Sequence, residues 1–514
     1  MSGSAPLSPA ALRRLKWPAP HAYTPPNSVP FYDPELYPHG VINLSIAENS
    51  LLSERLIEHI SRPLVSFRGQ HLRYRATLIK TDLQTVEDLL PAYINDHFEP
   101  RIPVTRENSV AGPGIGALLA QLVWALAGQG EGVLMSVVSP FNPSIHVAHP
   151  EITRPSPFTV RTRLSNALPS IQHVSTDDYF RDISHPAQAQ LIRAEIPAHV
   201  DSLSEDVLPL LEAKIKSSGR LGIPIKAMLI PNPHNPLPQV VPKEVITGYA
   251  LLAEKYDIHL IVDEVYGMST FHDSAYPPAV NVAFESALTY DFYAIGVNPA
   301  RVHVLAGPTK DFGASGLKMG LLVSPHNIPL MDLIRPLFNA TPISSASDAL
   351  FSRVLKDRVF VERFLEDNRI ALREAYELVA GWLIWHGLHF TRANAGVYVV
   401  VNFEPFLNRI SDPDMFPMEK LDRGVAALIK QGVFMKPTNL MGDPVPTRFR
   451  LVFSQPRSWM LLALRRIEQA FSAPEAPLPA NKFSGLNGTY MNGAGAGNGR
   501  HVYDSEPSSA SESE

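Results

Sequence analysis

The sequence predicts an α/β protein with a large doubly wound domain followed by a smaller C-terminal domain. Apolar runs typical of buried strands alternate with stretches whose apolar residues recur at helical spacing. Polar residues follow several of the strands, as they do at the carboxyl edge of a parallel sheet. The chain also has 514 residues, far more than one small core requires. These observations favour one large domain plus a second, smaller one.

The clearest unit lies in the middle of the chain. Residues 220–231 (RLGIPIKAMLIP) predict a buried strand, and residues 242–256 predict a helix whose apolar residues share one face. Residues 258–264 (IHLIVDE) predict the next buried strand. Two such strands joined by a helix predict a parallel βαβ unit, with functional residues at the carboxyl ends of its strands.

A second α/β segment follows a long helical stretch from about residue 347 to residue 386. Its strands are predicted at 394–403 (NAGVYVVVNF) and at 448–454 (RFRLVFS). The proline-rich residues 1–40 predict an N-terminal arm, and the Pro, Gly, Asn, Ser and Glu composition of 472–514 predicts a disordered tail. We therefore expect a large domain at 41–345, whose residues 41–75 could pack with the small domain, and a small domain at 346–471.

The composition excludes several classes of protein. A net charge of −5 and an isoelectric point near 6.4 argue against an electrostatic nucleic-acid binder. With no cysteine, the chain has no disulfide, no thiolate nucleophile and no cysteine metal site, and no metal is predicted. It has no apolar run of about 20 residues and no secretory signal core. We expect a cytoplasmic protein that binds neither nucleic acid nor membrane.

A lysine in the segment 307–320 (GPTKDFGASGLKMG) is the first candidate for chemistry. Lys310 is predicted in a tight turn between two apolar runs, where packing can desolvate it, depress its pKa and suit it to form an imine with an aldehyde. Upstream, the strand that ends in DEVY presents Asp263 and Tyr266. A lysine and a carboxylate are what pyridoxal phosphate needs, one as Schiff-base partner and one against the pyridinium nitrogen.

The loop between the strand and the helix of the βαβ unit reads NPHNPLPQ (232–239). Alone, this pattern indicates a turn stiffened by prolines. Here, however, Asn235 is expected at the same rim as Asp263 and Tyr266, where its side chain can donate to a cofactor oxygen.

A glycine-rich segment, residues 111–126 (AGPGIGALLAQLVWAL), opens an apolar helix whose first N–H groups could bind phosphate. It also fits the dinucleotide template, with Gly112, Gly114 and Ala117 in the glycine positions, so an NAD-dependent oxidoreductase stays open. Two observations weaken that alternative. Only SVAG precedes the motif, and Glu131 lies before the next strand, where it cannot reach a ribose.

Taken in chain order, the motifs resemble the fold-type I pyridoxal-phosphate enzymes of the class I/II aminotransferase family. The resemblance is strongest to the 1-aminocyclopropane-1-carboxylate synthase-like branch, which includes fungal secondary-metabolite members of the epidithiodiketopiperazine type. It rests on GVINLSIAENSL (40–51), NPxNP, DEVY, the TKD box, ANAG (393–396) and FRLVFS (449–454), and spans Val41 to Phe471. It implies a large doubly wound mixed sheet plus a smaller α/β domain, pyridoxal 5'-phosphate as cofactor, and a homodimer with shared active sites.

The resemblance also implies roles for individual residues. Lys310 would be the Schiff-base lysine and then the base that takes the substrate Cα proton, and Asp263 would keep the pyridine nitrogen protonated. Arg450 would pair with the substrate α-carboxylate, with Arg448 as the competing candidate. The remaining roles would fall to Asn235 and Tyr266 at the phenolic oxygen, the Gly114 and Ile115 amides with Thr309 and Lys318 at the phosphate, Tyr74 of the partner subunit, and Glu48 at the substrate.

The sequence departs from the family pattern near the phosphate and the ring. Gly307 stands in place of a serine, Lys318 in place of an arginine and Ile115 in place of a threonine. In SPFNP (139–143), Asn142 stands where an aromatic residue stacks on the ring, unless Phe141 takes over, and a Pro-rich stretch from 148 to about 169 is longer than expected. A looser phosphate grip and an altered substrate pocket are the expected consequences.

Lys310 and Asp263 serve several reactions equally, because each reaction begins with a carbanion at Cα. We expect an aminotransferase-like enzyme of fungal secondary metabolism, specifically toxin biosynthesis, that acts on an α-amino acid or a derived intermediate. A C–S lyase that cleaves cysteine-type conjugates and a cyclopropane-forming elimination remain alternatives. A non-catalytic homologue also stays open, because phosphate ligands are lost.

Overall fold

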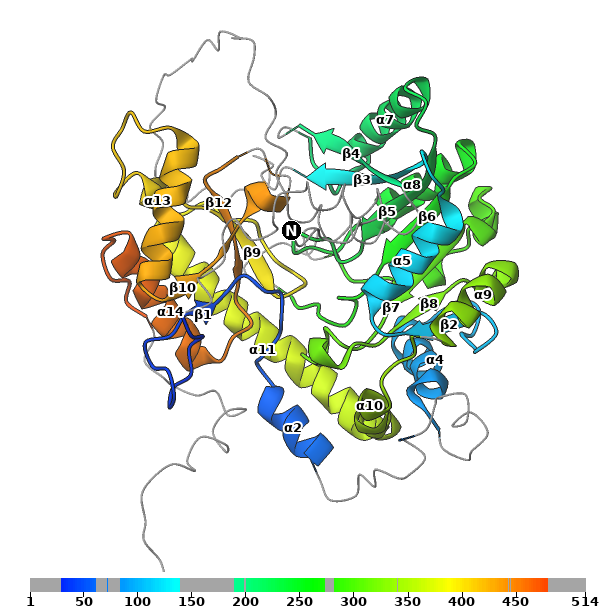
Figure 1. Ribbon diagram of the computed structural model, residues 1–514, viewed down its shortest axis with the longest axis horizontal. Coiled ribbons are helices and arrows are strands. Elements are labelled where there is room, and N and C mark those ends of the chain that lie inside the picture. The colour runs from blue at the N-terminus through cyan, green and yellow to red at the C-terminus, as the bar shows by residue number, and fades with distance from the viewer. Residues whose placement is uncertain are drawn as a thin grey trace, which may run out of the picture. The chain divides into compact units, whose positions relative to one another are not determined.

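The computed structural model describes residues 29–61, 72, 84–138, 189–197, 200–272, 282–339, 341–441, 443 and 445–478. They form a seven-stranded sheet, a three-stranded sheet and a two-stranded pair, with helices around them (Figure 1). These elements confirm the predicted α/β class. Contacts divide the chain into the unit Met1–Ala476, to which all these elements belong, and the unit Pro477–Glu514.

The seven-stranded sheet is mixed, as predicted. Five neighbouring strands are parallel, and the strand beside them, β8, runs in the opposite direction and also pairs with the edge strand β2. In spatial order the strands are β2 (Ser109–Gly112), β8 (Gly320–Val323), β7 (Val302–Ala306), β6 (His259–Asp263), β5 (Ile225–Pro231), β3 (Gly132–Val138) and β4 (Gln190–Ile196).

Helices cover both faces of this sheet, so its central strands are buried on both sides and read as continuous apolar runs. Leu229 and Ile261 face α5 and α9, whereas Met228 and Leu260 face the helices of the opposite side. The first side has α5 (Ile115–Leu126) and α9 (Ile328–Ile334), and the second has α4 (Val86–Phe98), α7 (Leu208–Arg220), α8 (Lys243–Lys255) and α10 (Ser345–Lys356).

The predicted βαβ unit is present as β5, α8 and β6, with the two strands parallel and adjacent. Lys310 lies in a turn between two apolar strands, as predicted, but the connection from β7 to β8 is longer than that turn. The connection 307–319 makes its own hydrogen bonds, from Phe312 N to Pro308 O and from Ala314 N to Thr309 O, and then forms the 3₁₀ turn Ser315–Leu317. Lys310 therefore lies in a structured loop.

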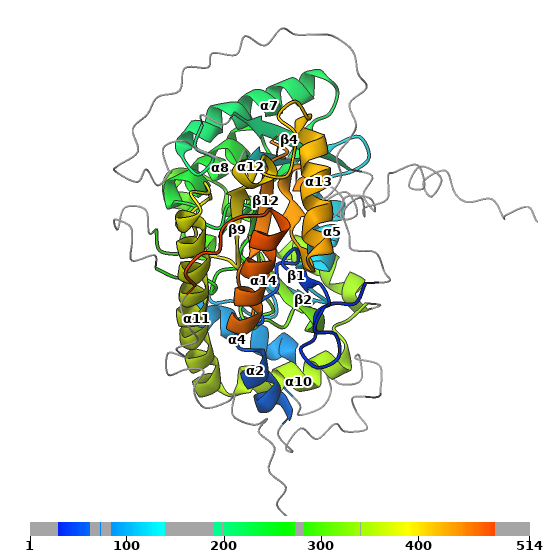
Figure 2. The ribbon, with the colours of Figure 1, turned by 90° about the vertical axis from the view of Figure 1, so that its left-hand side faces the viewer.

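The second sheet lies in the C-terminal part, where the sequence predicted strands. Its order is β11 (Lys436–Pro437), β12 (Arg448–Val452) and β9 (Tyr398–Asn402), and both pairs are antiparallel. An early segment joins this part, because β1 (Ile42–Asn43) pairs in parallel with β10 (Val433–Phe434). The helices here are α12 (Glu404–Leu407), α13 (Pro417–Lys430) and α14 (Arg457–Ala470), and Figure 2 shows α13 and α14 in front of the strands.

The long helical stretch is two helices, because the chain breaks at Asp357. The side chain of Asp357 accepts a hydrogen bond from Phe360 N (3.0 Å) and so caps α11 (Arg358–Trp385). A further helix, α2 (Ser53–Ser61), precedes the large sheet. Within the residues that the structure describes, no helix is both long and apolar enough to cross a membrane.

The chain remains ordered past the predicted domain end at Phe471. Ala473 N donates to the backbone oxygen of Glu468, and Ala476 N donates to its carboxylate. The predicted boundaries between arm, large domain, small domain and tail stay a proposal.

Candidate active site

The carboxyl edge of the large sheet brings together side chains that are far apart in the sequence. Asp263 is the last residue of β6, in register with Pro231 at the end of β5 and with Leu305 near the end of β7. Asn235 lies in the loop that follows β5, and Lys310 lies in the loop that follows β7. Three neighbouring strands thus deliver an amide, a carboxylate and an amine to one rim.

The Lys310 amine is held by backbone. Its Nζ donates to Ala47 O at 2.7 Å. Burial lowers the pKa of Lys310 to about 8, an effect that Glu48 opposes and that Arg450 and Lys318 reinforce. A pKa near 8 leaves a useful fraction of neutral, nucleophilic amine at neutral pH.

Asp263 is an acid with spare hydrogen-bonding capacity. Burial raises its pKa to about 6, while the backbone N–H of Val265 and the charge of Lys310 act in the opposite direction. Among the described residues, the one donor to its carboxylate is Val265 N at 3.2 Å. The second carboxylate oxygen is available for a cationic or N–H group of a ligand.

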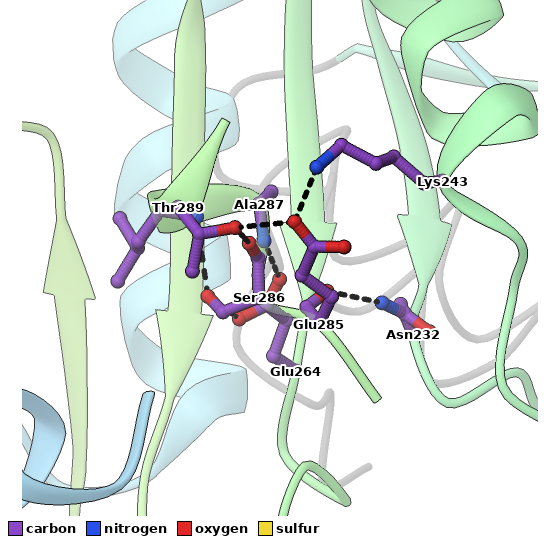
Figure 3. Close-up of polar contacts among 8 residues, drawn as sticks. Asn232, Lys243, Glu264, Glu285, Ser286, Ala287 and Thr289 are labelled. Atoms are coloured by element: carbon purple, nitrogen blue, oxygen red, sulfur yellow. Dashed lines mark hydrogen bonds and ion pairs between the residues drawn. The ribbon is translucent and has the colours of Figure 1, made fainter. Parts of the chain in front are cut away.

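Glu264, the next residue, has the opposite environment (Figure 3). It is fully buried, and its carboxylate accepts hydrogen bonds from Ser286 Oγ at 2.5 Å and Ala287 N at 2.7 Å. Burial raises its pKa to about 8, so it keeps its proton near neutrality. Beside it, Lys243 pairs with Glu285, whose backbone oxygen lies 3.5 Å from Asn232 Nδ2. Glu264 therefore fixes the end of β6 to the segment 285–289.

Asp311, the residue after Lys310, anchors the lysine loop as Glu264 anchors the end of β6. It is fully buried, and its carboxylate accepts hydrogen bonds from Ser269 Oγ at 2.6 Å and from Tyr93 Oη at 3.4 Å. Burial raises the pKa of Asp311 to about 7. The lysine loop is thereby tied to the turn that follows β6. Sequence reasoning missed both acids, although each directly follows a predicted site residue.

Asn235 and Tyr266 face the same rim. The side-chain oxygen of Asn235 is buried and has no hydrogen-bond partner among the described residues. Tyr266 is almost fully buried, and burial raises the pKa of its phenol, so the hydroxyl remains a donor. A buried polar atom without a partner is costly, which points to a ligand that completes the site.

The amino end of α5 is the candidate anion site. Gly114 caps the helix with φ of +95°, a conformation that favours glycine, and Ile115 begins the helix. Lys318 runs alongside, since a Cβ added at Gly114 would meet its Cδ at 3.8 Å. Thr309 is buried next to Lys310. The backbone N–H of Gly114, predicted as a phosphate donor, already donates to Gly112 O at 2.7 Å. The N–H groups of the first turn from Ile115 onward and the cation of Lys318 suit a phosphate.

The strand order around α5 does not fit a dinucleotide-binding site. β2 is an edge strand that pairs antiparallel with β8, and five strands separate it from β4 and four from β3. A dinucleotide fingerprint requires adjacent parallel strands on either side of the helix. The oxidoreductase alternative therefore loses its structural basis.

The small sheet contributes two arginines from β12. Arg448 forms an ion pair with Asp443 at 3.1 Å. Arg450 instead donates through Nη2 to Ser45 O at 2.6 Å and lies over the ring of Tyr398, 5.0 Å from its centroid. Its Nε has no acceptor among the described residues. Of the two arginines, Arg450 is the one whose charge has no carboxylate partner in the described part of the chain.

The remaining predicted residues fall into two groups. Glu48 has an exposed side chain that acts electrostatically on Lys310, while its backbone oxygen accepts from Ser454 Oγ at 2.7 Å. Tyr74, Phe141 and Asn142 lie outside the described residues.

Comparison with known proteins agrees with this geometry. The sequence profile described as aminotransferase class I and II matches residues 39–467. The probable aminotransferase aclI of Aspergillus oryzae is 30% identical over 372 residues, which are 71% of this chain and 76% of that protein. The probable aminotransferase sirI of Leptosphaeria maculans is 27% identical, with 87% and 94% of the two chains covered. The human 1-aminocyclopropane-1-carboxylate synthase-like protein 1 is 24% identical, with 86% and 78% covered.

Solved structures share the fold. An aromatic aminotransferase from Pyrococcus horikoshii superposes with a TM-score of 0.58 at 15% identity, covering 84% of this chain and 95% of that one. An aspartate aminotransferase from Thermus thermophilus with maleate gives 0.56 at 18% identity, with 84% and 91% covered. At these identities the similarity concerns the fold, and it confirms the predicted fold type I.

Proposed function

Because the chain belongs to the aminotransferase class I and II family, we propose that it transfers the amino group of an α-amino acid, or of an amino-acid-derived intermediate, to a keto acid. Enzymes of this family depend on pyridoxal phosphate, so pyridoxal phosphate is its cofactor. The observation that carries the proposal is the meeting of Lys310, Asp263 and Asn235 at one sheet edge, with Arg450 opposite.

The residues present fit this cofactor. Asp263 has a carboxylate oxygen available for the pyridinium N–H. The buried Oδ1 of Asn235 has no donor among the described residues, so it would accept from a phenolic hydroxyl, whereas donation to a phenolic oxygen would require the NH2 group of the rotated amide. The amino end of α5, with Thr309 and Lys318, would hold the phosphate. When bound, pyridoxal phosphate supplies a ring that accepts the electron pair left when Cα loses a proton.

Lys310 would attach the cofactor and then move the proton. Its neutral form, favoured by burial, is the nucleophile and the base, and its hydrogen bond to Ala47 O aims the amine. Asp263, once ionised, would hold a positive charge on the ring nitrogen. The two groups titrate at about 8 and about 6, so one interval of pH provides both required states.

Arg450 would bind the substrate carboxylate. The strand β12 fixes its backbone, Ser45 O holds one nitrogen, and the other donors of the guanidinium can form a two-point contact. Arg448 is less suitable, because Asp443 already neutralises it.

The departures at the phosphate have a partial explanation in the packing. A Cβ added at Gly307 would lie 3.0 Å from the Cα of Gly320, so a serine there would need the lysine loop to shift. Since one hydroxyl is absent and Lys318 offers a single cation, we expect weaker phosphate binding than a serine and an arginine would give.

The finer assignments are part of the same proposal. Relatives from Aspergillus, Leptosphaeria and Clonostachys are named aminotransferases or probable aminotransferases, which favours transamination. The place in a fungal secondary-metabolic pathway that makes a toxin rests on the resemblance of the sequence motifs. We place the enzyme in the cytoplasm as a homodimer, with Tyr74 of one subunit at the phosphate of the other.

The test is to incubate the holoenzyme with amino acids and with cysteine S-conjugates. Transamination predicts conversion of the cofactor to its amine form, detected by absorbance, and reversal by a keto acid. Pyruvate, ammonia and a free thiol without an added keto acid would instead establish C–S cleavage. A cyclopropane product would establish the elimination, and binding of the cofactor without turnover of any substrate would indicate a non-catalytic homologue.

A further inference from the structure

Tyr398 contacts three parts of the site and has no role in the function proposed above. It is the first residue of β9, it is fully buried, and it stands opposite Val452 of β12. Arg450 stands opposite Val400, so Tyr398 and Arg450 are diagonal neighbours on the sheet, close enough for long side chains to touch.

The ring of Tyr398 supports Arg450. The guanidinium carbon lies 5.0 Å from the ring centroid, within the range of a cation–π contact. The other fixed point of the guanidinium is its hydrogen bond to Ser45 O. A flat ring on one side and a carbonyl at one nitrogen restrict the plane of the guanidinium, and that plane decides whether a carboxylate can be bound at two points.

The hydroxyl of Tyr398 reaches the cofactor side. It donates to the backbone oxygen of His234 at 3.3 Å, and His234 directly precedes Asn235. The ring also meets Tyr266 edge to face, with centroids 6.1 Å apart and an interplanar angle of 85°. One side chain from the small sheet therefore links the arginine on β12, the loop after β5 and the turn after β6.

We propose that Tyr398 is a positioning residue for both halves of the site: its ring orients Arg450 toward the substrate carboxylate, and its hydroxyl fixes the His234–Asn235 backbone against the cofactor. This inference rests on the proposed function, because it assumes that Arg450 binds the carboxylate. The two groups act separately, so substitutions can remove the ring and the hydroxyl one at a time.

The experiment uses two probes that react with enzyme-bound pyridoxal phosphate. Aminooxyacetate carries a carboxylate and O-methylhydroxylamine does not, so the ratio of their reaction rates with the holoenzyme measures carboxylate recognition without knowledge of the substrate. The second readout is the Kd of the apoenzyme for pyridoxal phosphate. Thermal unfolding of each variant reports its stability.

We expect Tyr398→Leu to lower the rate ratio at least about fivefold, since it removes the ring beneath Arg450. Tyr398→Phe keeps the ring, so its ratio should stay within about twofold of wild type while its Kd for the cofactor rises about two- to tenfold. Phe403→Leu is the matched control: Phe403 is a fully buried aromatic directly after β9, packed on Phe449 and Phe471, and its loss should lower stability without changing the ratio.

Two results would overturn the inference, and they are distinguishable. If Arg450→Ala lowers the ratio but Tyr398→Leu leaves it unchanged, the ring does not position Arg450. If Tyr398→Phe leaves the Kd for pyridoxal phosphate unchanged, the hydroxyl does not position the loop. Should Arg450→Ala itself leave the ratio unchanged, the carboxylate role of Arg450 in the proposed function fails first.

Discussion

Two carboxylates in different parts of the molecule show how a ligand site differs from a structural one. Glu468, on α14 of the C-terminal part, accepts hydrogen bonds from Trp382 Nε1, Arg465 Nη1 and Ala476 N and lies 3.0 Å from His386 Nε2. Asp263, at the edge of the large sheet, accepts one bond, from Val265 N, among the described residues.

The pKa values of the two groups shift in opposite directions. Burial acts to raise the pKa of Glu468, but the four contacts together lower it below its ordinary value. At Asp263 burial prevails and the pKa rises to about 6. A carboxylate whose oxygens already accept hydrogen bonds from the protein stabilises the fold. A carboxylate with an oxygen that lacks a donor can accept a hydrogen bond from a ligand. Arg448 and Arg450 repeat this contrast two residues apart on β12.

The largest effect is expected at Lys310. Lys310→Ala should abolish the absorbance of bound cofactor and lower transamination at least about a thousandfold, because the nucleophile and the base are lost together. The stability of the Lys310→Ala protein should not fall, because the substitution removes an amine whose burial is unfavourable. Absorbance spectra and steady-state rates measure this. Lys243→Ala, which breaks the surface pair with Glu285, is the control and should leave both unchanged.

The two carboxylates should respond in opposite ways when neutralised. Asp263→Asn should lower kcat on the order of a hundredfold or more and leave the melting temperature unchanged or higher, because the charge is used in the reaction and costs the fold energy. Glu468→Gln should leave kcat unchanged and lower stability by about 1–3 kcal/mol, because buried donors lose an anionic acceptor. Chemical denaturation and kinetics on both variants measure these effects. A loss of kcat in Glu468→Gln together with a loss of stability alone in Asp263→Asn would contradict the comparison.

The two arginines give a smaller but parallel pair. Arg450→Ala should raise KM for the amino acid about 10- to 100-fold through loss of charge-assisted hydrogen bonds. Arg448→Ala should leave KM unchanged and destabilise the fold by about 3 kcal/mol, since Asp443 is left buried without its arginine. Equal effects of both substitutions on KM would place both arginines in the carboxylate site.

The smallest effect is in the pH dependence of stability. The pKa of Asp263 is raised from 3.8 to about 6 in the folded state, so its cost is absent below pH 3.8, grows as the pH rises through this interval and is complete above about pH 6. Asp263→Asn should therefore gain stability relative to wild type between about pH 4 and pH 6, on the order of 2–3 kcal/mol.

Glu468 provides the opposite sign. Its folded pKa lies below its ordinary value of 4.5, so its contribution is present above pH 4.5 and is lost as the pH falls. The difference between Glu468→Gln and wild type should thus shrink in acid. Denaturant titrations at several pH values measure both curves, and two curves with the same sign would contradict the comparison.

Much of the fold could be predicted, because the strands of a doubly wound sheet read as apolar runs and their carboxyl ends share one edge. From the sequence alone, this pattern predicts that Asn235, Asp263 and Tyr266 share one rim. Lys310 is joined to Asp263 by the needs of the cofactor, and the structure brings its loop to the same rim. Their roles in catalysis remain part of the proposal.

What could not be predicted depends on contacts between distant segments. Ser45 O could not be recognised as the acceptor for Arg450, because it is far away in the sequence and a backbone oxygen leaves no trace there. Asp443 is only five residues from Arg448, but the sequence does not show that the chain between them folds back to form the ion pair. Tyr398 could not be recognised either, because its sequence context is that of an ordinary strand residue and its contacts are with distant segments. The sequence predicts the turn at Lys310 but not the longer loop around it, because the hydrogen bonds within this loop join backbone groups.

The most direct test of the account is to find the residue that carries the cofactor. Reduction of the holoenzyme with borohydride fixes pyridoxal phosphate to its lysine, and mass spectrometry of the digested protein then locates the modification. We expect the label on Lys310, whose amine is partly buried, donates to Ala47 O and interacts electrostatically with Asp263. A label on the exposed Lys318, or none on Lys310, would contradict it.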